Sequence, residues 1–389
     1  MPMIIQEANR LNHVSEYYFS TKLAQIRAMD AQGLDVINLG IGNPDGMPPI
    51  AAIETLGQEA TKDGMHGYQS YRGILELRQA MTQYMHTAFA LGLNPETEIL
   101  PLIGSKEGIF HISMAFLNPG DGVLVPNPGY PTYRSVSNLL GAQIFEYDLK
   151  AEHDWQPDLA AMEKLPLEKV KLMWLNSPHM PTGSELSPET VKDLIAFAAK
   201  HHILLVHDNP YTQILNDQPQ SLLGYKGASE VMIELHSLSK SHNMPGWRIG
   251  WVAGKAEYIN TILKVKSNID SGMFKALQLA AAQALEAPAT WIATQQERYK
   301  RRKELVSELL RQLGCAIAPN QKGMFVWAAI PQTEDSEEAF AERLLQEAKV
   351  FMPPGHIFGS AGKGYIRASL CVPEERIIEA QKRVKEVLV

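Results

Sequence analysis

Seven short apolar runs, separated by helical patterns, constrain the fold more than any other feature of this sequence. They are EILPLIG (98–104), GVLVPN (122–127), QIFEYDL (143–149), VKLMWLN (170–176), ILLVHD (203–208), VMIELHSLS (231–239) and IGWVAG (249–254). Nearly continuous aliphatic and β-branched runs are typical of strands that are buried on both faces, as in a parallel sheet under helices. Their alternation with helical patterns therefore indicates an α/β fold.

One of the intervening helices has a readable start. In LSPETVKDLIAFAAKHH (186–202), Ser187 is a natural N-cap and Pro188 suits the first helical position. Apolar residues then recur at helical spacing along one face. We expect a helix from residue 188 to about residue 201.

The pattern changes near residue 290. The segment QQERYKRRKELVSELLRQLG predicts a long charged helix that ends at Gly314. Short strands (GMFVWAAI, KVFMPP and YIRASL) and amphipathic helices at 336–348 and 373–388 follow it. Since 389 residues exceed what one hydrophobic core usually serves, we expect two domains. The predicted division is an N-terminal arm that joins the small domain (1–45), a large domain (46–288) and a smaller α+β domain (289–389).

Bulk composition excludes several classes of protein. A net charge of -7 argues against nucleic acid as a partner, and no apolar run is long enough to span a membrane. Charges occur too early for a signal peptide, and Cys315 and Cys371 form no C-x-x-C pair, so we expect a cytosolic protein. The histidines lack zinc-ligand spacing, so no metal is expected. GIGNPDG (40–46) lacks the dinucleotide-binding spacing.

Lys240, in SLSKSHNMPGWRIGW (237–251), lies among hydroxyl groups and between apolar flanks. A buried amine near other cations has a lowered pKa and can condense with an aldehyde. Arg248, Ser237 and Ser239 offer a guanidinium and hydroxyls that suit a phosphate dianion. A phosphorylated aldehyde, pyridoxal 5'-phosphate, fits both features. The alternative, a surface lysine in a basic loop, fits the apolar flanks poorly.

A second phosphate element lies in LIGSKEGIFHISMAFL (102–117), which predicts a strand, a turn and a helix. Ser105 and Lys106 would begin this helix, where unpaired N–H groups and the positive end of the dipole favour an anion. Alone the turn could equally be an ordinary N-cap. The interpretation gains weight if the turn faces Arg248.

Three further segments place polar or aromatic side chains at strand ends and in loops. Asp208 ends an apolar strand, where it could keep a pyridine nitrogen protonated or simply cap the next turn, and Tyr211 follows it. Tyr130, in the Pro-rich loop NPGYPTY (127–133), could stack on a flat ring. Arg367, in the apolar strand of KGYIRASL (363–370), could bind a carboxylate or extend from an edge strand to solvent.

These segments match a known family over nearly the whole chain. The sequence resembles the class I/II, fold-type I pyridoxal-phosphate aminotransferases, whose large domain has a mostly parallel seven-stranded sheet between helices. The motifs that carry the resemblance are HGYQSYRGILELR (66–78), GSKEGI (104–109), PNPGYP (126–131), NSPHMPTG (176–183), HDNPY (207–211), SLSKSHNMPGWRIGW (237–251), PGHIFG (354–359) and YIRASL (365–370).

The resemblance implies a role for each site residue. Around the cofactor ring, it makes Lys240 the Schiff-base lysine and proton shuttle, pairs Asp208 with the ring nitrogen and Tyr211 with the ring oxygen, and stacks Tyr130 on the ring. Around the phosphate and substrate, the implied residues are Ser105, the Lys106 backbone, Ser237, Arg248, Tyr68 from the neighbouring subunit of a homodimer, Arg367 for the substrate α-carboxylate, and Gly42 in the substrate pocket.

One residue departs from the family pattern. Met180 stands where NPTG usually carries an asparagine that donates to the cofactor's ring oxygen, and methionine cannot donate. Tyr211 would then act alone, or with Asn176 or a water molecule. We expect this loss to raise the pKa of the lysine–cofactor link.

The resemblance implies transfer of an amino group between an L-amino acid and a 2-oxo acid, with ping-pong kinetics. GSKEGI, KSNIDSGMF (266–274) and HGYQSYRGI are most similar to the subgroup of glutamate–pyruvate (alanine) and LL-diaminopimelate aminotransferases. We expect glutamate/2-oxoglutarate with alanine/pyruvate; the alternatives are LL-diaminopimelate or a carbon–sulfur β-lyase on the same fold. A cofactor-binding transcription regulator is disfavoured, because about 45 residues are too few for a DNA-binding domain ahead of the large domain.

Overall fold

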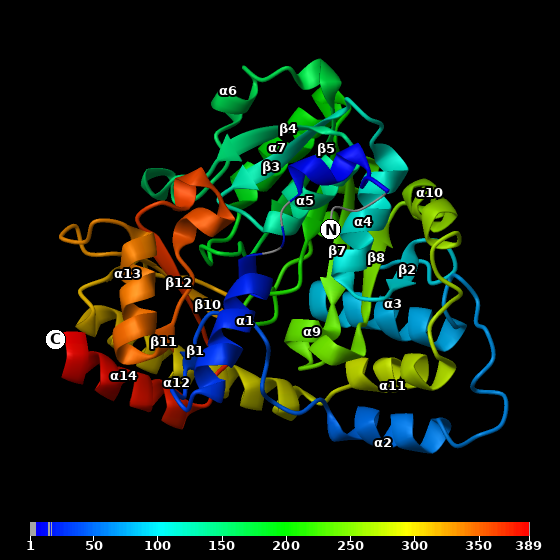
Figure 1. Ribbon diagram of the computed structural model, residues 1–389. Coiled ribbons are helices and arrows are strands. Elements are labelled where there is room, and N and C mark those ends of the chain that lie inside the picture. The colour runs from blue at the N-terminus through cyan, green and yellow to red at the C-terminus, as the bar shows by residue number, and fades with distance from the viewer. Residues whose placement is uncertain (1–4, 15, 17, 389) are drawn as a thin grey trace.

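A seven-stranded sheet forms the centre of the computed structural model, which describes residues 5–14, 16 and 18–388 (Figure 1). Its strands are β2 (Ile99–Leu102), β3 (Gly122–Asn127), β4 (Gln143–Asp148), β5 (Val170–Asn176), β6 (Leu204–Asp208), β7 (Met232–Ser237) and β8 (Gly250–Gly254). They lie in the order β2-β8-β7-β6-β5-β3-β4, and every pairing is parallel except the two made by β8. Each apolar run is thus a strand, and the mostly parallel α/β sheet is confirmed.

Helices cover both faces of this sheet, as alternation along β5 illustrates. Leu172 and Trp174 share a core with the first group of helices, whereas Met173 and Leu175 belong to the core on the opposite face. The first group contains α4 (Ser105–Phe116), α5 (Pro131–Leu139) and α10 (Ala256–Lys266). The second contains α3 (Leu75–Phe89), α7 (Pro188–His201) and α11 (Lys275–Leu285), with α2 (Ile50–Glu59) packed on α11. Burial on both faces explains why the runs are continuously apolar.

Serine caps set two of the helix starts that matter here. Ser187 Oγ accepts from Thr190 N at 3.1 Å, which confirms the predicted start of α7. The strand predicted for 231–239 extends two residues too far at its C-terminal end, because Ser237 Oγ accepts from Ser239 N at 3.2 Å and begins α9 (Leu238–Ser241). This turn leads the chain off the sheet just before Lys240.

The C-terminal part contains a separate three-stranded antiparallel sheet in the order β12-β10-β9. Its strands are β9 (Ala316–Ile317), β10 (Phe325–Ala329) and β12 (Tyr365–Ser369). The helices around it are α12 (Ala289–Gln312), α13 (Glu337–Arg343) with a π-helical turn (Leu344–Ala348), and α14 (Glu374–Leu388). Gly314, at φ 72°, follows the long charged helix where the sequence predicted its end.

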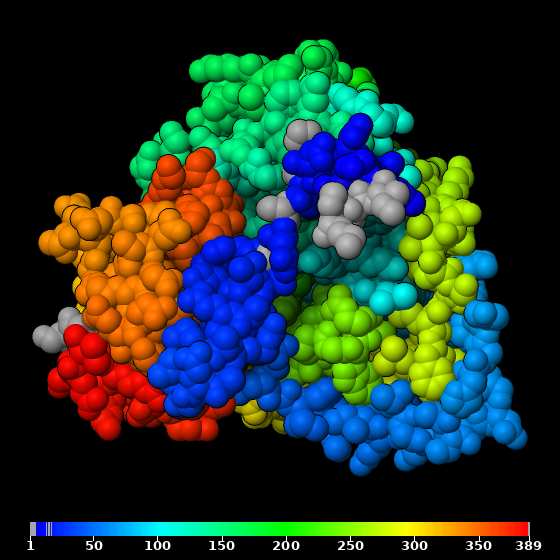
Figure 2. Space-filling model, viewed as in Figure 1, coloured from blue at the N-terminus to red at the C-terminus, as the bar shows by residue number. Residues whose placement is uncertain are grey.

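The N-terminal segment packs on this C-terminal part. After a 3-10 turn (Asn9–His13), α1 (Tyr18–Ala31) leads to β1 (Ile37–Asn38), which pairs in parallel with β11 (Val350–Phe351). Ile26 and Met29 of α1 share a small core with Leu345 and Phe351. Figure 2 shows α1, in blue, against the orange and red C-terminal elements. The predicted division into an arm, a large domain and a small domain at residues 45 and 288 stays a prediction.

Two further expectations concern membranes and cysteines. Every helix in the described part of the chain is too short or too polar to cross a membrane. Cys315 and Cys371 are both free and buried, as expected of cysteines that serve neither a disulfide nor a redox motif.

Candidate active site

A cavity of about 320 Å³ lies at the edge of the sheet where β5, β6 and β7 end. Its walls contain nine of the ten residues predicted to bind a cofactor: Ser105, Lys106, Tyr130, Asn176, Asp208, Tyr211, Ser237, Lys240 and Arg248. Asn176, Asp208 and Ser237 are the last residues of three adjacent strands. Because the carboxyl ends of parallel strands share one edge, segments far apart in sequence meet there.

Asp208 has one carboxylate oxygen available to a ligand. The side chain is 4% exposed, and Oδ2 accepts from the Tyr133 hydroxyl at 2.7 Å. Oδ1 is buried and has no hydrogen-bond partner among the described residues. Burial raises the pKa of Asp208 to about 6. A protonated ring nitrogen would supply both the missing donor and a positive charge that favours the carboxylate.

Tyr133 owes its fixed position to Trp174 beneath it. The two rings are stacked with centroids 4.8 Å apart and planes 5° from parallel. Tyr130 meets Tyr133 edge-on at 5.5 Å and is therefore held at the cavity wall. Both tyrosines come from the segment PNPGYPTY, but only Tyr130 was predicted.

Asn176 is tied to backbone at the cavity floor. Its Nδ2 donates to the Asp208 carbonyl at 2.7 Å, and its Oδ1 accepts from Met180 N at 2.6 Å. The side chain therefore links the ends of β5 and β6 to the loop that follows β5. This arrangement favours a structural role over the role of donor to the cofactor.

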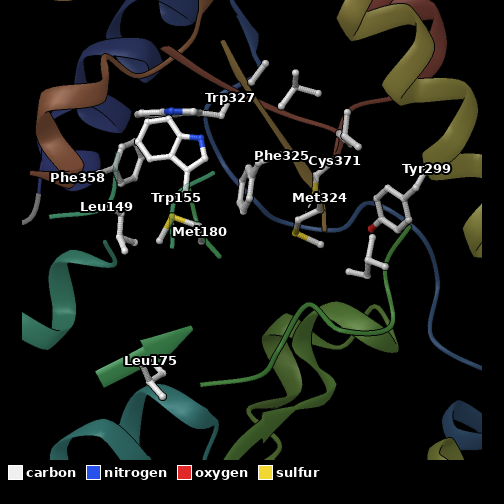
Figure 3. Packing of buried hydrophobic residues seen from close by; sticks show 14 of the residues in the cluster. Leu149, Trp155, Leu175, Met180, Tyr299, Met324, Phe325, Trp327, Phe358 and Cys371 are labelled. Atoms are coloured by element: carbon white, nitrogen blue, oxygen red, sulfur yellow. Dashed lines mark hydrogen bonds between the residues drawn. The ribbon is translucent and has the colours of Figure 1, made fainter. Parts of the chain in front are cut away.

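Met180 lies between the cofactor cavity and a second cavity described below. It is 5% exposed and lines both. Its sulfur lies 3.2 Å from Arg367 Nη1. Figure 3 shows Met180 near Trp155 and Phe358, with Phe325 on its other side. The residue that departs from the family pattern thus contacts the predicted substrate-binding arginine.

Arg248 packs against the turn that begins α4. Gly104 there has φ 80°, and a Cβ atom added to it would lie 2.2 Å from Arg248 Nη2. Arg248 Nη1 donates to the Pro245 carbonyl at 2.9 Å, which holds the guanidinium in place. Ser105 and the first N–H groups of α4 thus lie beside a cation, and an anion fits between them. Burial lowers the pKa of Lys106, and Arg248 acts in the same direction.

Lys240 is half-buried, and its Nζ donates to the carbonyl of Gly42. Burial lowers the pKa of Lys240, and the positive charges of Arg367 and Arg248 also lower it. These effects increase the fraction of neutral amine, which is the form that attacks an aldehyde.

A second cavity, of about 490 Å³, opens on the other side of Lys240. Its lining residues are Phe19, Ser20, Leu23, Arg27, Ile41, Gly42, Tyr130, Met180, Tyr211, Lys240, Phe325 and Arg367. Arg367 is 4% exposed, donates from Nη2 to the Gly40 carbonyl at 2.6 Å, and lies 3.9 Å from the centroid of the Phe325 ring. The carbonyl of Gly40 therefore accepts from the guanidinium to which a substrate carboxylate would bind, and the carbonyl of Gly42 accepts from Lys240.

Tyr68 lies outside both cavities. It is 93% exposed, in the loop between α2 and α3. Within one chain it cannot contact the cofactor, and its predicted role needs a second subunit. Sequence reasoning also missed Gly40 and Arg27. The glycine-rich segment 40–46 was a signal for Gly40, and no motif marked Arg27.

Comparison with known proteins identifies the family. The profile described as aminotransferase class I and II matches residues 34–384. The chain belongs to the class I and II aminotransferases. Pyridoxal phosphate is the cofactor that this family implies, and the site fits it through Asp208 Oδ1, the anion pocket beside Arg248, and the lowered pKa of Lys240.

Relatives of this aminotransferase include LL-diaminopimelate aminotransferases from Halothermothrix orenii (38% identical; 98% of both chains) and Dehalococcoides mccartyi (40% identical; 95% of this chain and 96% of the other). Substrate-bound BacF from Bacillus subtilis has a similar structure, with a TM-score of 0.92, 34% identity and coverage of 99% and 98%. The Thermus thermophilus aspartate aminotransferase with maleate has a TM-score of 0.91, 28% identity and coverage of 99% and 100%. Both sequence relatives are named for LL-diaminopimelate, which the sequence analysis gave as an alternative substrate. The comparison therefore favours that alternative over the alanine/pyruvate pair.

Proposed function

We propose that this aminotransferase transfers an amino group from LL-diaminopimelate to 2-oxoglutarate, or in the reverse direction. The observation that carries the proposal is the name shared by relatives that are 38–40% identical over at least 95% of the chain. A structural neighbour was solved with maleate, a dicarboxylate, which supports a substrate with two acidic groups. Two arginines, Arg27 and Arg367, line the substrate cavity and would suit such a molecule.

The residues around the cofactor cavity divide the work of catalysis. Bound pyridoxal phosphate supplies an aldehyde that condenses with amines and a ring that withdraws electrons. Lys240 would contribute its Nζ amine to that aldehyde and, once displaced by substrate, accept and return the substrate α-proton. Asp208 would hold the proton on the ring nitrogen, and Tyr211 would donate to the ring oxygen. Arg367 would bind the substrate α-carboxylate and so orient the α-hydrogen toward Lys240.

Phosphate binding would fall to the turn at the start of α4, to Ser237 at the N-cap of α9 and to Arg248 in the segment after α9. Ser105, the Lys106 backbone and Ser237 supply neutral donors, and Arg248 supplies a charge. These groups come from α4, from the end of β7 and from the segment after α9. By holding the phosphate at a fixed place, they would also hold the cofactor ring in position beside Lys240. Since donor and acceptor use the same site in turn, we expect ping-pong kinetics.

A homodimer with shared active sites is part of the proposal. Exposed large apolar side chains occur at the start of α2, in the loop before α3 and in the loop before α11; they include Met47, Ile50, Tyr68, Tyr71, Ile269 and Phe274. Such exposure is typical of a surface that contacts another chain. Tyr68 in this region would reach the partner's phosphate. Mixing Tyr68→Ala with Lys240→Ala chains tests the idea, since hybrids should regain up to about one intact site per dimer, whereas a site formed within one chain gives no recovery.

A cytosolic location completes the proposal. It is supported by two free, buried cysteines, which need no oxidising compartment. Fractionation of the native host, with this chain detected by antibody, would test it; recovery in an exported fraction would contradict it.

Half-reaction spectra test the substrate assignment. The purified holoenzyme is mixed with LL-diaminopimelate, glutamate or alanine, and the change in cofactor absorbance gives a rate for each; 2-oxoglutarate and pyruvate then test the return. We expect LL-diaminopimelate and glutamate to react faster than alanine. A faster reaction with alanine and pyruvate would replace the proposal by a glutamate–pyruvate enzyme. Cystathionine, which carries sulfur at Cβ, is tested alongside them, and release of pyruvate, ammonia and a thiol from it without a 2-oxo acid would indicate the β-lyase.

A further inference from the structure

Helix α1 forms the outer wall of the substrate cavity, and it places a cation there. Its cavity-lining residues are Phe19, Ser20, Leu23 and Arg27, whose spacing puts them on one face of the helix. The charged side chains that line this cavity in the described chain are Arg27, Lys240 and Arg367, all of them cations. A cavity with this lining attracts anions and gives them more than one place to bind.

Arg27 differs from Lys22, Arg376 and Arg383 in having no protein partner among the described residues. Lys22, on the same helix, is paired with Glu342 at 2.8 Å, and Arg383 and Arg376 both contact Asp35. Over the residues for which the structure gives positions, Arg27 takes part in no ion pair or hydrogen bond. Its guanidinium is exposed and faces a cavity rather than a carboxylate. All five of its N–H donors are therefore available to a ligand.

The wall around Arg27 and Arg367 is largely apolar. Leu23, Ile41 and Phe325 contribute carbon surface, which suits the methylene groups of a substrate side chain. The hydroxyl of Ser20 already donates to Glu16 at 2.6 Å and adds little. A ligand with an anionic group at each end and methylenes between them would match this lining.

We propose that Arg27 binds the distal carboxylate of dicarboxylic substrates, while Arg367 binds the α-carboxylate. This inference rests on the proposed function and extends it to both half-reactions, since glutamate, 2-oxoglutarate and LL-diaminopimelate all carry a second carboxylate. Arginine's planar fork accepts a carboxylate through two parallel hydrogen bonds. Arg27 would thus separate diacids from alanine and pyruvate, which end at a methyl group.

The test compares Arg27→Gln and Arg27→Lys with Lys22→Gln, a control on the same helix whose side chain is paired elsewhere. For each holoenzyme, kcat/KM is measured with glutamate and with alanine. We expect Arg27→Gln to lower the glutamate-to-alanine ratio about 10- to 100-fold, the range for loss of a charged hydrogen-bonded contact. Arg27→Lys should recover part of the ratio, and Lys22→Gln should keep that of the unmodified enzyme.

A binding measurement separates this inference from the proposed function. Calorimetric titration of glutarate and butyrate, which do not react, should show tighter binding of glutarate, and Arg27→Gln should remove most of that preference. An unchanged preference in Arg27→Gln, or no preference in the unmodified enzyme, overturns the inference. If LL-diaminopimelate is no substrate but the glutarate preference depends on Arg27, the proposed function fails and the inference stands.

Discussion

Glu234 lies in β7 with its side chain fully buried, and four nitrogen atoms surround its carboxylate. Oε2 accepts from His207 Nδ1 at 2.7 Å and from Leu222 N at 2.9 Å. Oε1 lies 2.6 Å from His236 Nε2 and accepts from Asn209 Nδ2 at 3.4 Å. The carboxylate therefore connects β6 and β7 to the segment between them. Two of its partners, His207 and Asn209, are the chain neighbours of Asp208. The perturbation we consider is Glu234→Gln, which keeps the shape of the side chain and removes its charge.

The geometry of His207 determines the expected magnitude. Its other ring nitrogen, Nε2, lies 2.9 Å from the Ser177 carbonyl. Both ring nitrogens thus face oxygen atoms, and the one at 2.7 Å faces the buried carboxylate of Glu234. A glutamine would remove the buried negative charge that these nitrogens surround and turn an NH₂ group toward N–H donors such as Leu222 N or Asn209 Nδ2. Removing one member of a buried pair costs about 3–5 kcal/mol, out of the roughly 5–15 kcal/mol by which a typical protein is stable.

The loss of stability caused by Glu234→Gln should depend on pH. Burial alone would raise the pKa of Glu234, but His207 and His236 outweigh it and hold that pKa well below its usual range. A group with a depressed pKa stabilises the fold above its unfolded pKa, about 4.3, and this contribution is lost as the pH falls through the folded pKa. The difference between the unmodified protein and Glu234→Gln should thus be complete at pH 7 and shrink below about pH 4.

Urea unfolding, followed by circular dichroism at pH 7, 4 and 3, measures this difference. Glu230→Gln is the matched control, because Glu230 forms an exposed pair with Lys255 that solvent screens, so its loss should leave the free energy of unfolding nearly unchanged. A loss below 1 kcal/mol for Glu234→Gln at pH 7, or a loss that stays constant down to pH 3, would refute the reasoning.

Three further substitutions probe the site. Met180→Asn restores a donor near the ring oxygen and should lower the pKa of the lysine–cofactor link in a spectrophotometric pH titration; an unchanged pKa would sink the hypothesis. Tyr133→Phe removes a hydrogen bond that lowers the pKa of Asp208, so the acid limb of the kcat/KM profile should move to higher pH, and an unmoved limb would contradict it. Asn176→Ala breaks two buried hydrogen bonds and should destabilise the fold by about 2–4 kcal/mol in urea unfolding; a change below 1 kcal/mol would exclude the linking role.

Most strands and helices could be predicted from the sequence. Strands that are buried on both faces of the sheet are continuously apolar, and this pattern is visible in the sequence itself. The seven runs became the seven strands, and Ser187 began α7 as expected. The antiparallel direction of β8 was not readable, since direction depends on how the chain returns to the sheet. The end of β7 was missed by two residues because a serine cap outweighs an apolar run there.

Site residues were readable where a motif carried them and not where only tertiary structure brings them together. Tyr133 contacts Asp208 across 75 positions of sequence, and nothing local distinguishes it from other tyrosines. Arg27 reaches the substrate cavity because β1 pairs with β11 and so fixes α1. The role proposed for Tyr68 depends on a second chain, which no pattern within one chain can position.

The central claim is that Lys240 forms the covalent link to pyridoxal phosphate, and borohydride reduction tests it most directly. Lys106 is the only other lysine that lines the cofactor cavity in the described chain, so it serves as the internal control. Reduction of the holoenzyme followed by peptide mass mapping should place one pyridoxyl group on Lys240, and Lys240→Ala should bind cofactor without this link or turnover. A label on Lys106, or full turnover by Lys240→Ala, would contradict the account.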